Sequence, residues 1–598
     1  MDDSHLPTTS IREPRYRERR VEVEHRADGS IIISNPTPFS NAFQTTNAAL
    51  DYWGKRDQTR TWLAERSGLG WRRMSYGEAF QRVARLAGAL RGLGLGPGRP
   101  LLILAGNSID HALIAYAAMR IGAPIAPVSP QYGQKGAEPS RLAHAVELIR
   151  PAAIFVDDAA AYTEALERNV LAGLIVIAGR NERHGDNPLQ ALTILGHAVP
   201  DLAKPDDIAK LLLTSGSTGR PKAVIGLQRN LALNSAQIEA CFDDPEPPLM
   251  VHGAPWSHSL GGNAILHMAL HRGGTLYIDH GQPTPARFGE TVRNLKEIAT
   301  TYHNMVPAGF GLLAHELERD ADLAKVFFER VRLLQYGGAG LAQSICDRIQ
   351  AVALRTVGEQ ISFGSGYGAT ETGPTACNVH WPNLRAGMIG LPVPGTFVKL
   401  APEGEKYEIR VRGPQISPGY YNAPPGMSEP FDAEGYYMLG DAARLLDPER
   451  PDLGMVFDGR LVENFKLSSG TFIAAGTLRL AAISAIGGAV SDAVVCGEGR
   501  EGVGLLLFRN TPFCAKLSGE AEVVQAVRAG LEGLNARASG AGGKVARALI
   551  LDDAPDVHSG EITDKGYINQ ALARARRAAD VERLFADPPG EGVLAFEG

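Results

Sequence analysis

A short run of small hydroxylated residues, glycines and one lysine stands out at residues 213–226, which read LTSGSTGRPKAVIG. Gly216 and Gly219 have no Cβ, so the backbone can turn sharply and point consecutive N–H groups inward. Further donors come from four hydroxylated side chains, Thr214, Ser215, Ser217 and Thr218. Lys222 adds a mobile positive charge. The combination predicts a loop that holds the phosphates of a nucleotide.

The nearest alternative motif is the Walker A loop, G-x-x-x-x-G-K-[ST]. It is not matched, because Lys222 follows Pro221 and precedes Ala223 rather than Ser or Thr. A polar surface hairpin or a Ser/Gly linker would also be glycine-rich. Neither explains a lysine placed just past a Gly-x-Pro and flanked by the apolar runs LLL and AVIG.

The composition is that of a globular protein. The chain has 598 residues, 44% hydrophobic and 21% charged, which predicts about two to four domains. A formal charge of −6 gives no general attraction to nucleic acid or to an anionic membrane, and no apolar run reaches the roughly 18 residues of a membrane span. The start is acidic and polar, unlike a signal peptide. We expect a cytoplasmic enzyme without nucleic-acid or membrane partners, as a monomer or homodimer.

The cysteines and histidines give no metal pattern. Five scattered cysteines are never in C-x-x-C spacing, so we expect reduced thiols rather than disulfides or structural zinc: Cys241, Cys346, Cys377, Cys496 and Cys514. His267 and His271 are four residues apart, but the glutamate of H-E-x-x-H is missing. They read as histidines on a partly buried helix.

The order of elements predicts an α/β fold. A hairpin is expected over residues 21–34, and then helical segments such as 78–94 alternate with short apolar strands at 100–106, 152–158 and 174–179. Gly94, Gly96 and Gly98 do not satisfy G-x-G-x-x-G and read as a helix stop and turn.

Further along, apolar strands run into polar or glycine-rich ends, where α/β folds bind ligands. These segments are 275–280, 301–310, 331–340 and 360–373. From about residue 395 shorter alternating strands predict a β-rich module. After Arg460 a smaller unit follows, with strands near 491–497, 502–508 and 547–553 and helices around 522–534 and 567–585. The predicted division is an N-terminal part, 1–459, with two α/β layered subdomains plus the β-rich module, and a small α+β part, 460–598.

Four motifs in order resemble the signature of the acyl-adenylate-forming superfamily: LTSGSTGRPKAV, GYGATETG (366–373), YYMLGD (436–441) and DGR (458–460). More narrowly, APWSHSLGGN, HNMVPAGFGLL, YGGAGL, RAGMIGLPVPG, VFDGRLVENFKLSSGTF and GEITDKGYINQ resemble feruloyl-CoA synthetases. The similarity runs from about residue 20 to 585. It implies a large N-terminal domain and a small mobile C-terminal domain, with ATP and coenzyme A as cosubstrates and Mg²⁺ as a cofactor.

The resemblance implies roles on the nucleotide side. The glycine-rich loop and Lys222 would hold the β- and γ-phosphates. Thr370 would contact the α-phosphate, and Glu371 would hold Mg²⁺ with help from Thr214, since Mg²⁺ prefers a carboxylate plus phosphate oxygens. Glu371 would otherwise be an ordinary helix-start carboxylate.

The resemblance also implies an adenosine site. Tyr367 would stack on adenine beside Gly368, with Gly338, Ala339 and Gly340 forming the other wall. Asp441 would accept hydrogen bonds from the ribose, and Arg460 would bind there or at phosphate. Alone, a Gly-Asp is usually a turn and a tyrosine usually packs in a core.

The remaining implied roles concern the acid and the thiol. Lys565 corresponds to the family's C-terminal lysine that neutralises charge between carboxylate and α-phosphate; a lysine at a helix start is otherwise a solvated residue. His258, Gly338 and Gly366 would line the acid site, with a structural histidine as the rival for His258. After adenylation the C-terminal domain would rotate, so that the segment around Lys466 and Gly470 shapes the coenzyme A tunnel.

The chain departs from many superfamily members at the hinge, where Val462 replaces Asp or Lys two residues after the DGR arginine. The pivot residue is therefore open, as are the partners of a ring hydroxyl, which include His303, Tyr336 or neither. The expected function is activation of a hydroxycinnamic acid as acyl-AMP and its transfer to coenzyme A. The alternatives are another aromatic or aliphatic acid, delivery to a carrier protein, or a non-catalytic binding protein.

Overall fold

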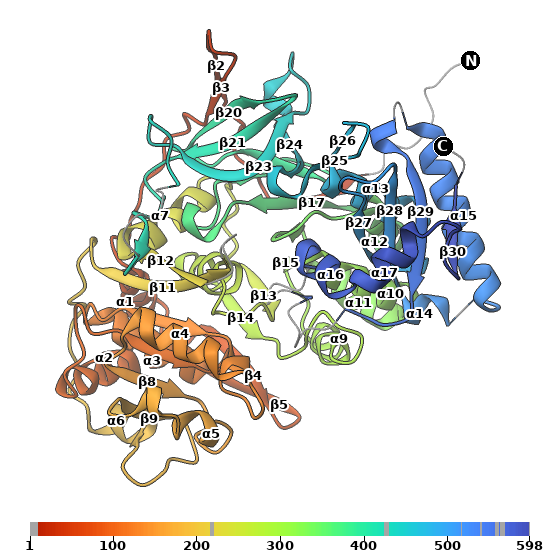
Figure 1. Ribbon diagram of the computed structural model, residues 1–598. Coiled ribbons are helices and arrows are strands. Elements are labelled where there is room, and N and C mark those ends of the chain that lie inside the picture. The colour runs from red at the N-terminus through yellow and green to blue at the C-terminus, as the bar shows by residue number, and fades with distance from the viewer. Residues whose placement is uncertain are drawn as a thin grey trace.

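The computed structural model describes residues 10–215, 221–423, 430–515, 517–538, 541–555, 561–562 and 568–596. Figure 1 shows a first α/β part at the lower left, a second α/β part and a β-rich region above and beside it, and the C-terminal unit at the right. The predicted α/β class, with a large N-terminal part and a smaller C-terminal α+β part, is confirmed.

The first part is built on a mostly parallel sheet in the order β10-β9-β8-β6-β7-β11-β12-β22. Its strands are Asn187–Pro188, Ile175–Ala178, Ala153–Val156, Leu101–Leu104, Ile125–Val128, Ile208–Ser215, Pro221–Leu227 and Tyr420–Tyr421. Alternate residues of β6 and β8 enter two separate cores, so both faces are covered and the strands read as continuous apolar runs. The helices of this part are α1 (Thr46–Arg56), α2 (Tyr76–Gly92), α3 (Ile109–Arg120), α4 (Pro139–Ile149), α5 (Thr163–Leu166), α6 (Leu189–Leu195) and α7 (Gln228–Glu239).

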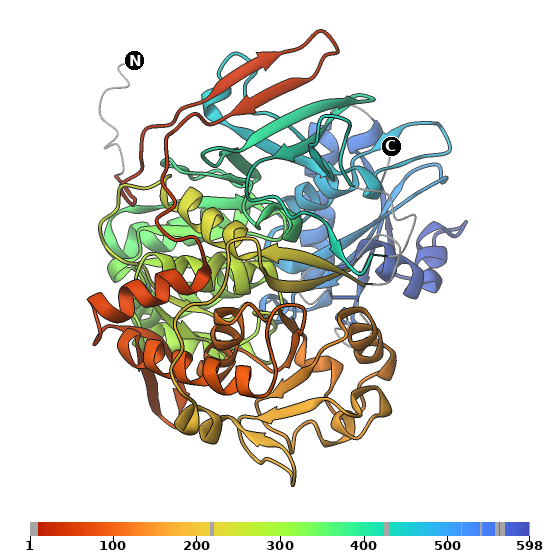
Figure 2. The ribbon, with the colours of Figure 1, turned by 90° about the vertical axis from the view of Figure 1, so that its left-hand side faces the viewer.

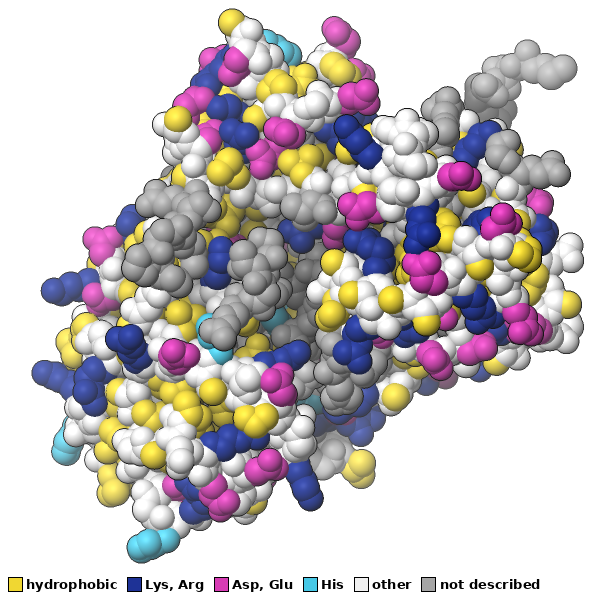
Figure 3. Space-filling view, viewed as in Figure 1, with side chains coloured by type: hydrophobic (Ala, Val, Ile, Leu, Met, Phe, Trp, Pro, Cys, Tyr) yellow, Lys and Arg dark blue, Asp and Glu magenta, His cyan; other side chains and the backbone are white. Residues whose placement is uncertain are grey.

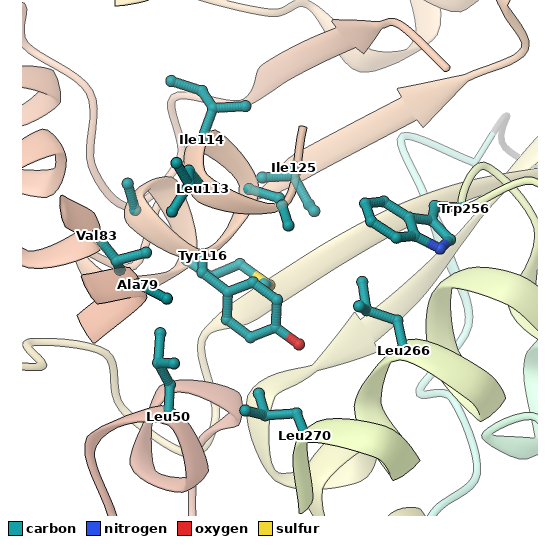
Figure 4. Packing of buried hydrophobic residues seen from close by; sticks show 14 of the residues in the cluster. Leu50, Ala79, Val83, Leu113, Ile114, Tyr116, Ile125, Trp256, Leu266 and Leu270 are labelled. Atoms are coloured by element: carbon teal, nitrogen blue, oxygen red, sulfur yellow. The ribbon is translucent and has the colours of Figure 1, made fainter. Parts of the chain in front are cut away.

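One core joins the first part to a distant segment of the chain. Figure 4 shows Tyr116 and Leu113 of α3 beside Leu50 of α1 and Val83 of α2, with Leu266 and Leu270 approaching from the other side. Both leucines belong to α8 (Leu266–His271), which lies between β13 (Leu249–His252) and β14 (Thr275–Ile278). These two strands form a third sheet with β4 (Thr61–Ser67) and β5 (Gly70–Ser75).

The second α/β part begins with three parallel strands, β15 (Tyr302–Met305), β16 (Leu333–Tyr336) and β17 (Gln360–Tyr367). One face is covered by α9 (Phe288–Glu297), α10 (Pro307–Arg319), α11 (Ala321–Arg330) and α12 (Gln343–Val357). The ladder then continues without a break through β18 (Cys377–Asn378) and β19 (Met388–Pro392) into the β-rich region. The β-rich region is therefore an extension of the second sheet and not a sheet of its own.

That extension runs through β24 (Met455–Arg460), β23 (Tyr437–Leu445), β21 (Lys406–Arg412) and β20 (Phe397–Glu403). It ends on the predicted N-terminal hairpin, β3 (Ile31–Ser34) and β2 (Glu22–His25), while β1 (Ile11–Arg12) pairs with β17. Figure 2 shows this hairpin at the top of the molecule, beside the strands it extends.

The C-terminal unit packs α13 (Ala475–Ile486) and α15 (Glu520–Arg537) against the sheet β27-β28-β29-β30. Its strands are Val490–Cys496, Val503–Arg509, Val545–Leu551 and Val593–Ala595, and a small hairpin, β25 (Phe465–Lys466) and β26 (Phe472–Ile473), precedes them. A short helix, α14 (Thr511–Cys514), follows β28. The single helix expected over 567–585 is two helices, α16 (Gln570–Arg576) and α17 (Ala578–Phe585), because the chain turns at Arg577.

The remaining expectations about composition can be checked directly. All five cysteines are free, and four of them are buried. Over the described ranges, no helix is both long and apolar enough to cross a bilayer.

Candidate active site

The two ends of the predicted phosphate loop lie opposite each other. Strands β11 and β12 form an antiparallel hairpin in which Thr214 pairs with Lys222. This is the local structure expected for an apolar run on either side of a glycine-rich turn. Gly216, Ser217, Thr218 and Gly219 lie outside the described residues, as does the side chain of Ser215. The structure therefore fixes the two flanks of the loop.

Lys222 and Glu371 meet around one tyrosine. Tyr420 belongs to β22, which pairs with β12, and the Lys222 Nζ lies 4.9 Å from the centre of its ring. The Tyr420 hydroxyl donates to Glu371 Oε1 at 3.1 Å and lies 3.1 Å from the Tyr437 hydroxyl. Burial and the nearby Glu371 charge raise the pKa of Tyr420 to about 12, so its phenol stays protonated and can donate.

A second cluster joins three residues of the predicted adenosine site. The Tyr367 hydroxyl donates to Asp441 Oδ2 at 2.8 Å, and Arg460 Nε donates to Asp441 Oδ1 at 3.0 Å. Asp441 and Arg460 face each other across the β23–β24 ladder, while Tyr367 ends β17. Burial, together with the Asp441 charge, raises the pKa of the Tyr367 phenol. The arrangement gathers an aromatic ring, a carboxylate and a guanidinium, as an adenosine and its phosphate require.

Thr370 links the nucleotide side to the segment that carries His258. It begins the short 3₁₀-helix Thr370–Thr372, and its hydroxyl donates to Ser259 Oγ at 3.1 Å. His258 is half-buried and directly precedes Ser259, at the start of the π-helix Leu260–Ile265. Any transfer of a carboxylate to an α-phosphate held by Thr370 would take place beside this segment.

The glycines of the site leave room or permit close approach. A Cβ on Gly366 would meet only Gln335 Nε2, at 3.8 Å, and a Cβ on Gly338 would meet nothing within 4 Å. A Cβ on Gly368 would lie 2.1 Å from the Pro374 carbonyl oxygen, so no side chain fits there. Ala339 lies between Gly338 and Gly340 and is partly buried.

Gly340 touches the C-terminal unit. A Cβ on it would lie 2.6 Å from Leu480 Cδ1 of α13. Nearby, Ala342 and Ile345 pack into the core of the C-terminal unit. The loop expected to line the nucleotide therefore also forms the docking surface of α13.

The proposed coenzyme A residues lie apart from these clusters. Lys466 and Gly470 are exposed on the β25–β26 hairpin, where the Lys406 Nζ lies over the ring of Phe472 at 5.7 Å. Among the contacts of the described residues, none joins Lys466 or Gly470 to Glu371, Tyr367 or His258. Lys565 lies outside the described residues, so its proposed role is untested by the geometry. At the hinge, residues 461–463 form a 3₁₀-helix.

Figure 3 shows the surface hollowed where the β11–β12 hairpin, the β-rich region and the C-terminal unit face one another. The residues at hand fit a hydrated Mg²⁺ that is bound with ATP, because the Glu371 carboxylate and nearby hydroxyls are oxygen donors. Within the described part of the chain no group of three or more His, Cys, Asp or Glu side chains could cage a metal. Phosphate oxygens and water would therefore have to complete its coordination.

The sequence analysis missed four polar residues of this region. Tyr420 follows no motif, and Lys210, Asn304 and Gln335 lie within strands that read as apolar. Asn304 and Gln335 could have been considered because each lies next to a residue that was weighed as a partner of the ring hydroxyl, His303 or Tyr336. In the structure His303 and Tyr336 pack in the helix-covered core of the second sheet, which favours the alternative that neither meets a substrate ring.

His267 and His271 are buried on α8, as expected. His267 Nδ1 lies 2.8 Å from the Tyr116 hydroxyl, and His271 Nδ1 lies 2.8 Å from Glu239 Oε2. Both imidazoles are thus part of the packed interior around α8.

Comparison with known proteins finds two matching families. The family described as AMP-binding enzyme matches residues 50–421, and the AMP-binding enzyme C-terminal domain matches residues 479–588. A feruloyl-CoA synthase of Amycolatopsis sp is 28% identical over 411 residues, which are 66% of this chain and 76% of the relative. A 4-coumarate–CoA ligase of Pinus taeda is 27% identical over 390 residues, 61% of this chain and 68% of the relative.

A carboxylic acid reductase of Segniliparus rugosus is 27% identical over 423 residues, 65% of this chain, but the match spans about a third of that protein (34%). Solved structures share the fold. The adenylation domain of a carboxylate reductase from Mycobacterium chelonae has a TM-score of 0.75 at 19% identity and covers 92% of both chains. The anthranilate CoA ligase AuaEII in complex with anthranoyl-AMP has a TM-score of 0.74 at 16% identity, covering 90% of this chain and 97% of that one. Since the first family match covers more than half of its length, the chain belongs to the AMP-binding enzyme family.

Proposed function

We propose that this protein is an ATP-dependent ligase that converts a hydroxycinnamic acid such as ferulate into its coenzyme A thioester. The observation that carries the proposal is the convergence of Lys222, Glu371, Thr370 and the Tyr367–Asp441–Arg460 cluster on one region of the molecule. Cations, hydroxyls and a carboxylate gathered in this way suit the transfer of an adenylyl group. The names of the relatives, feruloyl-CoA synthase and 4-coumarate–CoA ligase, support the choice of acid.

Two successive displacements would occur. A carboxylate oxygen of the acid attacks the α-phosphorus of ATP, the bond to the β-phosphate oxygen breaks, and pyrophosphate leaves. The coenzyme A thiolate then attacks the acyl carbon, and AMP leaves. Lys222 and Thr370 would hold the phosphates, and Lys565 would offset the repulsion between the carboxylate and the α-phosphate. Mg²⁺, bound through Glu371, would neutralise phosphate charge.

The polar end of the acid site favours an acid that carries a ring hydroxyl. On β15 and β16, Asn304 and Gln335 share the face that is opposite to the helix-covered core. Gln335 Nε2 donates to Asn378 Oδ1 at 2.7 Å, and Gln335 Oε1 accepts from the Tyr302 hydroxyl. Asn304 Nδ2 lies farther from Gln335 Oε1, at 3.4 Å. A contact of 3.4 Å is weak, so a ring hydroxyl could compete for the Asn304 amide N–H. The space beside Gly366 opens directly onto the Gln335 amide.

The chain of hydrogen bonds fixes how these amides point. The Ala254 N–H donates to His252 Nδ1 at 3.2 Å, which leaves Nε2 as the protonated nitrogen, 3.4 Å from Asn304 Oδ1. Burial lowers the pKa of His252 to about 4, so the imidazole is neutral near pH 7. The network is thus an uncharged hydrogen-bonding surface, which suits a phenol better than a second carboxylate.

An acid panel tests the proposal. Purified protein with ATP and Mg²⁺ is given ferulate, 4-coumarate, unsubstituted cinnamate, benzoate or hexanoate. Entry of labelled pyrophosphate into ATP reports adenylation, and thioester absorbance after addition of coenzyme A reports the second step. We expect the two hydroxylated acids to lead in both assays. Exchange that is absent with every cinnamate, or greatest with hexanoate, would reject the proposal.

The substitution Gln335→Met tests the polar end of the site. It keeps the approximate volume and removes the amide, so it should reduce the preference for 4-coumarate over cinnamate by about tenfold, the value of one lost hydrogen bond to an uncharged partner. The control is Gln350→Met, because Gln350 is a buried glutamine whose hydrogen bonds within the described ranges are with the backbone at Ile361. An unchanged preference in Gln335→Met would exclude this amide from recognition.

One observation favours a second acceptor. The match to a carboxylic acid reductase spans about a third of that protein (34%), and solved adenylation domains of carboxylic acid reductases share the fold. These relatives are not named as coenzyme A ligases, so transfer of the acyl group to a carrier protein is the alternative to coenzyme A. Pyrophosphate exchange without any thioester after coenzyme A is added would favour this alternative.

A further inference from the structure

Lys210 is a buried lysine in the strand that leads into the phosphate loop. It lies on β11, four residues before Thr214, and its residue is 3% exposed. The contacts described for its Nζ are with two neutral oxygens, the Gly262 carbonyl at 2.6 Å and Asn263 Oδ1 at 3.2 Å. A buried amine without a carboxylate beside it is costly, and groups of this kind concentrate at functional sites.

Both acceptors belong to the π-helix Leu260–Ile265. π-Helical turns are rare in proteins, and those that occur often lie at functional sites. This one is packed tightly on the loop before it, because a Cβ on Gly261 or Gly262 would lie 2.3 Å from the carbonyl oxygen of Ala254 or Trp256, respectively. The same loop is held by Asn107, which bonds to Ala254 and Trp256.

The π-helix faces the reacting groups at its N-terminal end. His258 and Ser259 precede it, Ser259 bonds to Thr370, and the Leu260 side chain lies over Gly337 next to Gly366. A cavity bordered by Lys210, Asn263 and Thr370 lies between the two sides. Asn230 borders it as well, and its Oδ1 is buried without a hydrogen-bond partner among the described residues. A small cavity with a mostly apolar lining thus lies between Lys210 and Thr370, the residue expected at the α-phosphate.

We propose that Lys210 is a positioning residue that fixes the π-helix, and through it His258 and Ser259, against the strand that carries the nucleotide loop. The acid and the α-phosphate must meet in line within a few tenths of an ångström, and Lys210 ties together the two elements that hold them. The expected effect on catalysis rests on the proposed function, whereas the anchoring of the π-helix by Lys210 rests on the fold alone.

The chemistry of the amine suits this role. Burial lowers the pKa of Lys210 to about 7. The titratable groups that face it are the imidazoles of His111 and His267, whose pKa values are lowered by burial and, to a smaller extent, by Lys210 itself. A neutral amine keeps two N–H donors, which equals the number of acceptors at the π-helix. The tie therefore persists on both sides of neutral pH.

The test is Lys210→Met, which keeps the length of the side chain and removes its donors. We expect kcat/KM for the acid in pyrophosphate exchange to fall about 10- to 100-fold, with KM for ATP unchanged. The melting temperature should stay the same or rise, because apolar replacement of a buried charge is often neutral or stabilising.

The matched control is Lys399→Met, at a buried lysine of β20 that pairs with Asp432 and Glu434. This variant should lose thermal stability and keep the kinetics. If Lys210→Met behaves like Lys399→Met, or leaves kcat/KM for the acid intact, the proposal fails.

A second readout separates this inference from the proposed function. Hydrogen exchange of the peptide 256–268 needs no substrate. We expect Lys210→Met to speed exchange there and to leave the β20–β21 region unchanged. Absence of acid-dependent exchange in the wild type would reject the function, whereas unchanged protection of 256–268 in Lys210→Met would reject the positioning role.

Discussion

Two lysines on one β-hairpin have opposite surroundings. Lys222, on β12, is partly exposed and lies over the Tyr420 ring beside Glu371. Lys210, on the partner strand β11, is buried against the π-helix, with neutral oxygens as its partners. The strands are paired, yet the first lysine lies at the mouth of the hairpin and the second at its base.

The difference shows that the role of a lysine depends on its position in the hairpin. At the loop end of the hairpin, where β12 begins, a lysine can reach a mobile anion. Deeper in the sheet the charge is expensive and the amine acts as a hydrogen-bond donor that fixes two elements. One lysine is suited to binding substrate and the other to holding the site in shape.

The largest effect is expected for Lys222→Met. Loss of a phosphate-binding cation should reduce pyrophosphate exchange about 100- to 1,000-fold at every acid concentration, by analogy with the removal of one preorganised donor.

Lys565→Ala should reduce the rate of adenylation by a similar factor and spare thioester formation from supplied acyl-adenylate. Both steps are measured separately, and equal damage to them in Lys565→Ala would contradict its assignment.

The second prediction concerns pH and stability at Lys210. Its pKa is about 7 in the folded protein and roughly 10.4 in the unfolded chain, so the unfolded chain binds more protons between these values. The stability penalty is therefore full below pH 7 and decreases as the pH rises. The advantage of Lys210→Met over wild type in unfolding free energy should shrink by up to about 1.4 kcal/mol per pH unit above pH 7. Parallel urea-unfolding curves at pH 6, 7, 8 and 9 measure it; a constant difference would contradict the prediction.

Glu371→Gln tests the other partner of Tyr420. It keeps the hydrogen bond at 3.1 Å and removes the charge, so pyrophosphate exchange should fall about tenfold or more at low Mg²⁺. Raising the Mg²⁺ concentration should recover part of the loss. Exchange that is independent of Mg²⁺ in both forms would show that Glu371 does not serve the metal.

The smallest effect is expected for Tyr367→Phe. The ring remains available to adenine, while the hydrogen bond to Asp441 at 2.8 Å is lost. KM for ATP should rise about 3- to 10-fold with kcat unchanged, which corresponds to one hydrogen bond. Steady-state kinetics with varied ATP decide it, and a fall in kcat alone would place Tyr367 nearer to the reaction than we propose.

The nucleotide side of the site could be predicted from the sequence because its residues follow one another in short motifs at strand ends. Tyr367, Thr370 and Glu371 fall within eight residues, and the DGR arginine faces Asp441 only because β23 and β24 are neighbours. Lys210, Asn304 and Gln335 could not be found in this way. One strand shows that neighbouring residues face opposite sides, but not which side faces the substrate, since that depends on packing with helices distant in the chain.

The fold was predictable to a similar depth. The alternation of strands and helices predicted the α/β class, the N-terminal hairpin and the strands β27, β28 and β29 of the C-terminal unit, but not β30. The continuity of the second sheet with the β-rich region was not visible, because the pairing of β18 with β17 and β19 depends on contacts between separate segments. The break at Arg577 was missed because the residues on both sides are good helix formers.

The edge pairing of β3 has a practical consequence for anyone who trims this chain. Ile31–Ser34 pair with Phe397–Leu400, the first four residues of β20, and Ile33 is completely buried there, although the family match starts only at residue 50. A recombinant fragment that begins at residue 50 would leave the backbone N–H and C=O groups of Phe397–Leu400 unpaired on that side. Unpaired strand edges promote strand exchange and aggregation. Expression trials should therefore retain the first fifty residues, even though these lie before the recognisable signature.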